Sequence, residues 1–275
     1  MILKNACINI SSSFYLAASL CISFFFNPCP FFLTVHLTVY FKCDSEDQEC
    51  LKGLYKTALV NVGAKGIPEL DIPPIDPFNL KNVYMSPFGF ANISFVDSVV
   101  TGIKDCEFNS FSIDIEGNHA KADLTCDITL QGHYLATPLN PFLVSLLGGT
   151  DIRGDGKAKV KVSKINVKLD FYLTISKRDD NEIYVTFDST HPHYEYDVLD
   201  KVSFDIDGFY IDNEDSSALI KKLLNDNWPS VFYTAGSSVM DSTMKYVYNY
   251  TNKFFDSVPA KHYLADDLTR FLMSE

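Results

Sequence analysis

The sequence predicts an α+β fold in which a strongly curved antiparallel sheet wraps one long C-terminal helix. Apolar residues recur at every second position through the middle of the chain, and at every third or fourth position near its end. A continuous helix over residues 216–258 would be roughly 60 Å long at about 1.5 Å per residue. A compact domain of this size is narrower than that. The helix therefore needs a sheet that bends around it.

Composition and charge are those of a globular protein. Hydrophobic residues make up 47% of the 275 positions and charged residues 21%. The 23 Lys and Arg residues against 35 Asp and Glu residues give a formal net charge of −12 at pH 7. Such a surface repels phosphate backbones and anionic lipid head groups. We therefore expect no nucleic-acid partner and no electrostatic docking to membranes.

Residues 1–42 are typical of a secretory leader. Two apolar runs, at 14–26 and 31–41, follow a single basic residue, Lys4. Either run has the length of a signal-peptide apolar region, so we expect cleavage between the thirties and about Lys42. A membrane anchor spanning both runs, or extra residues before the true signal, are the alternatives. After cleavage we expect a secreted protein, residues 43–275, without stable membrane association.

Four cysteines follow the leader, in agreement with export. Cys43 and Cys50 enclose six mostly acidic residues, a loop short enough to close in an oxidising compartment. A two-residue hairpin turn at Gly117-Asn118 would leave Cys106 and Cys126 out of register across the hairpin. We therefore expect Cys106 and Cys126 to be free core thiols rather than a bridge.

The first element of the mature chain is expected to be a short amphipathic helix that ends at Gly63. Its apolar residues have helical spacing: Leu51, Leu54, Tyr55, Ala58, Leu59 and Val62. The segment Gly66–Phe78 then holds four prolines within ten residues. Because proline fixes φ and lacks an N–H donor, this segment is predicted to be an extended, ordered connector. Its apolar residues imply that it packs against the body of the protein.

Residues 88–211 have an apolar period of two, which predicts about eight strands. The stretch 120–130 alternates throughout, as in a strand with one wet face. Apolar residues pass from even to odd positions at Ser163-Lys164, which predicts a β-bulge or bend. Residues 138–149 interrupt the pattern with two prolines and a Gly-Gly pair, and predict a long loop or short helix.

The helical period at 216–258 contains one proline. Pro229 removes a helical donor, so we expect a kink or a fresh helix start there. Residues 212–216 supply N-caps and Pro259 supplies the stop. One helix cannot cover the apolar faces of about eight strands. We therefore expect a cavity or tunnel between sheet and helix.

Catalytic and metal motifs find little support. The sequence has no nucleophile elbow, His-Glu-x-x-His, phosphate loop or dinucleotide glycine pattern, so we expect no enzyme and no cofactor. His191-Pro-His193 is interpreted as a loop or strand end rather than metal ligands. Asp205-Ile-Asp207 is interpreted as a strand rather than half a calcium loop, and Arg153-Gly-Asp155 as a turn rather than an adhesion tripeptide. Asn92 and Asn249 begin glycosylation sequons, which are usable if the chain is exported.

Four places in the sequence carry a family resemblance. They are Cys43-x6-Cys50; the proline-rich segment Gly66–Phe78; Gly132-His-Tyr134 with Gly154-Asp-Gly156; and Leu224-Asn-Asp-Asn-Trp228 with Val258-Pro259. Together they resemble the takeout and haemolymph juvenile hormone-binding proteins of insects, from Cys43 to the C-terminus. The resemblance implies a Cys43–Cys50 disulfide and a tubular lipid-binding (TULIP) fold around a hydrophobic tunnel. Family members are secreted carriers of terpenoid hormones, fatty acyl compounds or odorants, some linked to feeding, circadian output or olfaction.

We therefore predict a secreted, non-enzymatic carrier of one small, elongated hydrophobic ligand. Tyr134 is expected to help orient the ligand. The other wall candidates are chosen by facing alone, that is, because they lie on the apolar face of their expected strand or helix: Ile93, Phe95, Phe111, Ile113, Leu124, Ile128, Phe171, Leu173, Met240, Met244 and Val247. The alternatives are a secreted glycoprotein with a filled core that acts on an unidentified receptor, and a lipase-like enzyme.

Overall fold

A computed structural model describes residues 42–272, apart from 87–90, 139–141, 143–144, 146–148, 150 and 189–192. The expected leader, up to residue 41, lies outside the described residues. So do most of the expected loop at 138–149 and His191 of the His-Pro-His motif.

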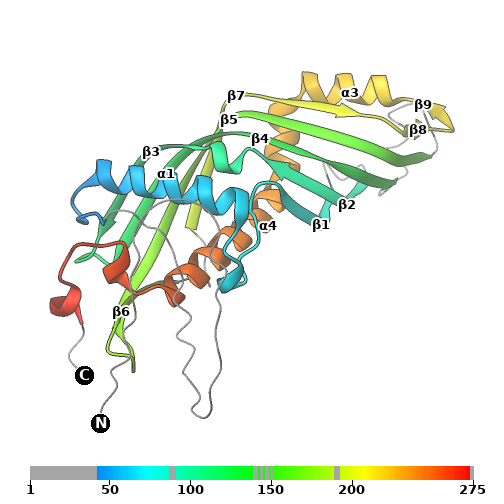
Figure 1. The fold of residues 1–275 in the computed structure, drawn as a ribbon. Helices are drawn as coiled ribbons and strands as arrows, with labels where there is room; N and C mark the ends of the chain where they lie inside the picture. The colour runs from blue at the N-terminus through cyan, green and yellow to red at the C-terminus, as the bar shows by residue number, and fades with distance from the viewer. Residues whose placement is uncertain are drawn as a thin grey trace, which may run out of the picture. The chain divides into compact units, whose positions relative to one another are not determined.

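One strongly curved antiparallel sheet forms the body of the described part. Its nine strands are β1 (Phe78–Met85), β2 (Ala91–Thr101), β3 (Glu107–Asp114), β4 (His119–Pro138), β5 (Ile152–Lys177), β6 (Ile183–Phe187), β7 (His193–Ile206), β8 (Phe209–Ile211) and β9 (Glu214–Asp215). The order β1-β2-β4-β5 continues into β8 and β9 at one end, while β7 pairs with β5 along its length. The two long central strands, β4 and β5, are paired from His119–Tyr172 to Ala136–Gly154. Figure 1 shows them running most of the length of the sheet.

The long strands bend where the sequence predicts a bulge. The register of β5 against β7 shifts between Ser163 and Ile165, and that of β4 against β5 shifts opposite, at Asp127. Lys164 has φ +53° and donates its backbone N–H to Asp127 Oδ1 at 2.9 Å. The extra residue restores the apolar facing of β5 and increases the local twist, so one strand serves both halves of the curved sheet.

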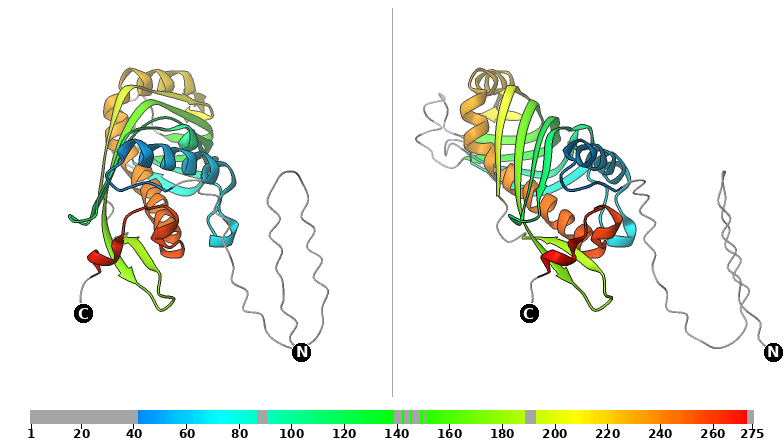
Figure 2. Two further views of the ribbon diagram at one scale, coloured as in Figure 1. Left: turned by 60° about the vertical axis from the view of Figure 1, so that its left-hand side comes forward. Right: turned by 90° about the vertical axis from the view of Figure 1, so that its left-hand side faces the viewer.

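The C-terminal helix is divided at the predicted place. Helix α3 (Ser217–Asp226) ends before Asn227, and α4 (Trp228–Ser257) begins with Pro229 in its first turn, where a missing N–H is tolerated. Ser217 N donates to Asp215 Oδ1 at 2.9 Å at the start of α3. At about 1.5 Å per residue, the 30 residues of α4 span roughly 45 Å. Figure 2 shows the sheet curling over α4.

Helix α1 (Gln48–Lys65) is longer than predicted, because Gly63 does not end it. The helix ends at Gly66, which has φ +66°. Gly63 lies inside the last turns, where an added Cβ would come within 2.7 Å of Lys104 Cβ. The glycine therefore serves a close approach between α1 and the short helix η3 (Ile103–Asp105).

The proline-rich connector is ordered, as expected, but contains one turn of 3-10 helix, η1 (Pro68–Leu70). It is fastened by Asp76, whose side chain is buried. Asp76 Oδ2 accepts hydrogen bonds from the backbone N–H groups of Gly102 and Lys104, each at 3.0 Å. The connector therefore joins α1 to β1 along a fixed path.

Cys106 and Cys126 form a disulfide, so the prediction of two free thiols is wrong. The hairpin turn between β3 and β4 has four residues rather than two, because Asp114 pairs with His119. A further shift between Phe108 and Ser110 moves the register by one more residue. Together the two changes bring the cysteines opposite one another. The Cys43–Cys50 disulfide is present as the family resemblance implied, with Cα atoms 5.6 Å apart.

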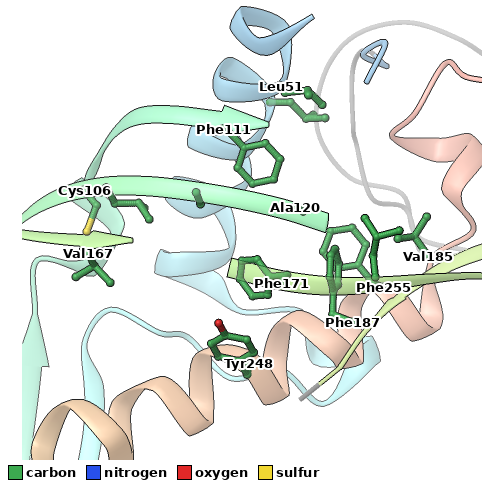
Figure 3. Close-up of a cluster of buried hydrophobic side chains, with 14 of the residues drawn as sticks. Leu51, Cys106, Phe111, Ala120, Val167, Phe171, Val185, Phe187, Tyr248 and Phe255 are labelled. Carbon is green, nitrogen blue, oxygen red and sulfur yellow. The ribbon is translucent and has the colours of Figure 1, made fainter. Parts of the chain in front are cut away.

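Buried apolar side chains form two clusters. The α1 cluster contains Leu51 of α1, Phe111 of β3, Phe171 of β5, and Tyr248 and Phe255 of α4, among others; Figure 3 shows it. The β8 cluster contains Phe78, Phe95, Tyr134, Ile152 and Phe209, among others. Residues such as Ile128 and Val160 pack against both clusters.

Tyr248 ties α4 to the sheet within the α1 cluster. Its hydroxyl lies 2.7 Å from His193 O and 3.1 Å from Asp170 O, so it reaches β7 and β5 together. Burial raises the pKa of Tyr248 to about 12. The hydroxyl therefore remains a donor over the whole physiological range of pH.

Candidate ligand-binding cavity

A cavity of about 930 Å³ lies between the sheet and α4. This volume is near the upper end of the range of about 300–1,000 Å³ typical of small-molecule sites. The wall includes Phe171 and Phe255 of the α1 cluster as well as Phe95 and Phe209 of the β8 cluster. The cavity therefore joins the two clusters and follows the long direction of α4.

Most of the residues predicted from facing lie on the wall of this cavity. These are Ile93, Phe95, Phe111, Leu124, Ile128, Tyr134, Phe171, Met240, Met244 and Val247. Ile113 and Leu173 do not line it. They face the same side of the sheet as Phe111 and Phe171, two residues away, but they pack into the α1 cluster. Facing decides which side of the sheet a side chain occupies, not whether the space beyond it is filled.

The wall also includes residues that the facing argument left out. They come from α1, the connector and α3: Tyr55, Ala58, Leu59, Val62, Ile67, Ile72, Ile75, Ile220, Leu223 and Leu224. The signal for them is present in the sequence, as the helical period of α1 and the apolar residues between the prolines. What the sequence does not show is that these elements cover the open side of the curved sheet.

The two glycine motifs pack around Tyr134. On the paired strands β4 and β5, Tyr134 lies opposite Gly156. An added Cβ on Gly154 would lie 2.8 Å from Tyr134 Cε2, and one on Gly156 would lie 2.3 Å from Asp207 O. The glycines therefore leave room for the ring and for the chain beside it.

The Tyr134 hydroxyl is already engaged in this packing. It donates to Asp207 O at 2.8 Å, and the residue is buried. Burial, with the nearby Asp207 carboxylate, raises the pKa of Tyr134 above its ordinary value. Its ring forms part of the wall, while its hydroxyl proton is donated in a hydrogen bond that joins β4 to the end of β7.

Side chains of α3 and α4 form hydrogen bonds to the backbone of the edge strand β7. Asn225 Nδ2 donates to Phe204 O at 2.8 Å, and Asn225 Oδ1 accepts from Phe204 N at 3.0 Å. Farther along, Val198 N donates to the Tyr233 hydroxyl at 3.2 Å. These bonds satisfy an exposed sheet edge and hold the helices over one side of the cavity. Asn225 belongs to the Leu224-Asn-Asp-Asn-Trp228 segment, so this is a structural role for that motif.

The disulfide loop at Cys43 is bound to the C-terminal segment. Cys43 N donates to Tyr263 O at 3.2 Å, and Ala265 N donates to Cys43 O at 2.8 Å. The Ser45 backbone N–H and hydroxyl both donate to the Asp266 carboxylate, at 2.9 and 2.7 Å. The start of α1 is thereby fixed beside the end of the chain.

Other sequence motifs have plainer roles. Arg153-Gly-Asp155 lies inside β5, so the expectation of a turn is wrong, and Arg153 stacks on the Tyr210 ring. In the described part of the chain, no group of three or more His, Cys, Asp or Glu residues could hold a metal ion. None of the described helices combines the length and apolar character needed to cross a membrane. Both sequon asparagines, Asn92 on β2 and Asn249 on α4, are exposed.

The curved sheet, the long helix and the apolar cavity between them define an α+β protein whose sheet wraps its C-terminal helix. The chain belongs to the haemolymph juvenile hormone binding protein family, whose model matches residues 20–265. Its structure is similar to the crystal structure of Epiphyas postvittana Takeout 1, with a TM-score of 0.72 and 22% sequence identity. That match covers 82% of this chain and 99% of Takeout 1, and shows the shared fold. A comparison with curated proteins found no match.

Proposed function

We propose that the protein is a secreted carrier that binds one elongated apolar molecule in the cavity and shields it from water. The observation that carries this proposal is the apolar cavity of about 930 Å³, which the surrounding side chains leave unfilled. Membership of a family named for binding juvenile hormone supports it. The proposed ligand classes are terpenoid hormones, fatty acyl compounds and odorants.

The expected affinity follows from the burial of apolar surface. A ligand that buries about 500 Å² of apolar surface gains roughly 12 kcal/mol at about 25 cal/mol per Å². Association costs at least about 4 kcal/mol in lost freedom of motion. About 8 kcal/mol remain, which corresponds to a Kd of about 1 μM.

Secretion is supported by the covalent chemistry of the described residues. The Cys43–Cys50 and Cys106–Cys126 disulfides require an oxidising compartment to form and persist. The apolar runs before Lys42 supply a signal for entry to such a compartment. In that compartment the exposed Asn92 and Asn249 become acceptors for glycans.

The cavity favours a carrier over the two alternatives. A glycoprotein that acts only through its surface has no need of a large apolar cavity in its core. An ester hydrolase needs a base beside its nucleophile, whereas the described wall presents hydroxyls of Ser230, Thr243 and Thr251 without a His, Asp or Glu among the lining residues. Binding without turnover is therefore the activity that the wall supports best.

The test is uptake of a fluorescent apolar probe, N-phenylnaphthylamine, by residues 42–275 secreted from insect cells behind a heterologous signal peptide. Met240→Trp places a large ring on the α4 side of the cavity and is expected to reduce uptake at least tenfold. Leu199→Trp is the matched control, because Leu199 is 60% exposed on β7 and does not line the cavity. A folded wild-type protein that takes up neither the probe nor a fatty acyl or terpenoid competitor would contradict the proposal.

A further inference from the structure

The described wall of the cavity carries no charged side chain. Its polar members are hydroxyls and one carboxamide: Tyr55, Tyr134, Asn227, Ser230, Thr243, Tyr246, Tyr250 and Thr251. All other lining residues are aliphatic, aromatic, methionine, glycine or disulfide-bonded cysteine. Charged residues make up 21% of the chain, so their absence from the wall reflects exclusion rather than scarcity.

We propose that the cavity selects uncharged ligands and rejects the ionised carboxylate of the same chain length. This inference rests on the proposed carrier function and names the ligand class within it. An ionised carboxylate moved from water into the cavity would find no cation to pair with, which costs several kcal/mol. An ester, ketone or alcohol oxygen needs only one hydrogen-bond donor.

Tyr55 supplies a donor for such an oxygen. The hydroxyls of Tyr134 and Thr243 already donate to Asp207 O and Val239 O, each at 2.8 Å. The Tyr55 hydroxyl forms no hydrogen bond with any described residue, while its ring stacks on Phe111 with the centroids 3.9 Å apart. Tyr55 lines the cavity, so this donor has no acceptor among the described residues to compete with a bound ligand.

The Tyr55 hydroxyl stays protonated under all relevant conditions. Burial raises the pKa of Tyr55 above its ordinary value. The group is therefore a neutral donor that can bind a neutral acceptor, and it offers no positive charge to a carboxylate.

A fatty acid has a second possible binding mode, in which its carboxylate does not enter the cavity. A smaller pocket between β1 and α4 shares Tyr246 with the cavity and is lined by Lys81 and Lys245. A fatty acid whose tail enters the cavity while its carboxylate stays at this surface would keep its head group in water beside two cations. The arrangement predicts equal binding of acid and ester, and dependence of the acid alone on Lys245.

The experiment is displacement of N-phenylnaphthylamine from the secreted protein by dodecanoic acid, its methyl ester and dodecane. At about pH 8 the acid is ionised, because the ordinary carboxyl pKa is about 4.3. We expect the ester to displace the probe at a concentration about 100-fold lower than the acid, as follows from a penalty of several kcal/mol. Tyr55→Phe should weaken the ester about fivefold, the effect of one hydrogen bond, and leave dodecane unchanged.

The outcomes separate this inference from the carrier function. Equal displacement by acid and ester in the wild type overturns the selectivity while the carrier function stands, and a loss of acid binding in Lys245→Gln would then place the head group at the surface pocket. A Tyr55→Phe variant that weakens ester and dodecane alike overturns the role of Tyr55 as donor. Failure of the folded protein to bind the probe or any of the three ligands overturns the carrier function and the inference with it.

Discussion

The Cys106–Cys126 disulfide gives a stability prediction whose size follows from the structure. The bond joins the residue after η3 to the middle of β4, across 20 positions of sequence, and both cysteines are buried. The double variant Cys106→Ala/Cys126→Ala removes the crosslink while leaving the hairpin register to the backbone pairs that flank it. The unfolded chain thereby regains the freedom that the bond removes.

The magnitude comes from the entropy of loop closure. A loop of about 20 residues corresponds to roughly 3.3 kcal/mol at 25 °C, whereas the Cys43–Cys50 loop, with a separation of 7, corresponds to roughly 2.4 kcal/mol. For a domain of this size, about 2–4 °C of melting temperature are lost per kcal/mol. The Cys106/Cys126 variant should therefore melt roughly 7–13 °C lower than the wild type.

Two measurements check the prediction. Urea unfolding of the wild type and of both double-alanine variants gives the free energies, and the Cys43/Cys50 variant is the control for losing a disulfide of shorter loop. Thiol titration of the unfolded, unreduced wild type should find no reactive thiol at Cys106 or Cys126. Two reactive thiols at these positions, or an unchanged free energy of unfolding in the variant, would refute the reasoning.

Two further substitutions test how the cavity is held together. Asp76→Ala leaves the backbone N–H groups of Gly102 and Lys104 without their acceptor, and should lower the free energy of unfolding by about 2–4 kcal/mol in urea. Asn225→Ala frees both backbone groups of Phe204, and should cost about 1–3 kcal/mol and speed amide hydrogen exchange at Phe204.

Each substitution has a matched control. Asp71→Asn removes the charge of an aspartate whose side chain is 98% exposed and which, among the described residues, pairs with Lys253; asparagine tolerates its φ of +52°, so the change should cost less than about 1 kcal/mol. Asn61→Ala changes an exposed helical asparagine on α1 that is outside any glycosylation sequon, and should change stability by less than about 0.5 kcal/mol. Equal losses from the two aspartates, or protected exchange at Phe204 in Asn225→Ala, would contradict the assigned roles.

Local structure is well encoded in the order of apolar residues. The change from even to odd positions at Ser163-Lys164 predicts the bulge that bends β5, because only one extra residue restores the facing. Pro229 predicts the start of α4 for an equally local reason, its missing N–H. The long C-terminal helix and the curved sheet follow from the same two periods.

The pairing register of the strands is harder to predict from the sequence, because it depends on residues outside the apolar pattern. The disulfide register required a four-residue turn and a second shift near Asn109, whose side chain is exposed and bonds to Asp123. Strand β1 was missed for a related reason: its buried positions pass from even to odd between Leu80 and Val83, so no steady period marks it. Neither the disulfide register nor strand β1 can be predicted until the partner strand is known.

The cavity wall could be predicted only in part. Facing placed Phe111 and Phe171 correctly on the inner side of the sheet, but it gave the same assignment to Ile113 and Leu173, where other core side chains fill the space. The contribution of Tyr55 depends on where α1 docks, a contact between distant parts of the sequence. The period of a segment determines its inner face, whereas a cavity is what the whole assembly leaves unfilled.

Native mass spectrometry of the protein as secreted, followed by organic extraction, tests the central claim most directly. We expect a mass above that of the glycosylated polypeptide, and release of an uncharged apolar molecule into the organic phase. Met240→Trp should lower the retained amount, whereas Leu199→Trp should not. A folded wild-type protein that shows only its own mass and takes up no terpenoid, fatty ester or fatty acid when these are offered would contradict the carrier account.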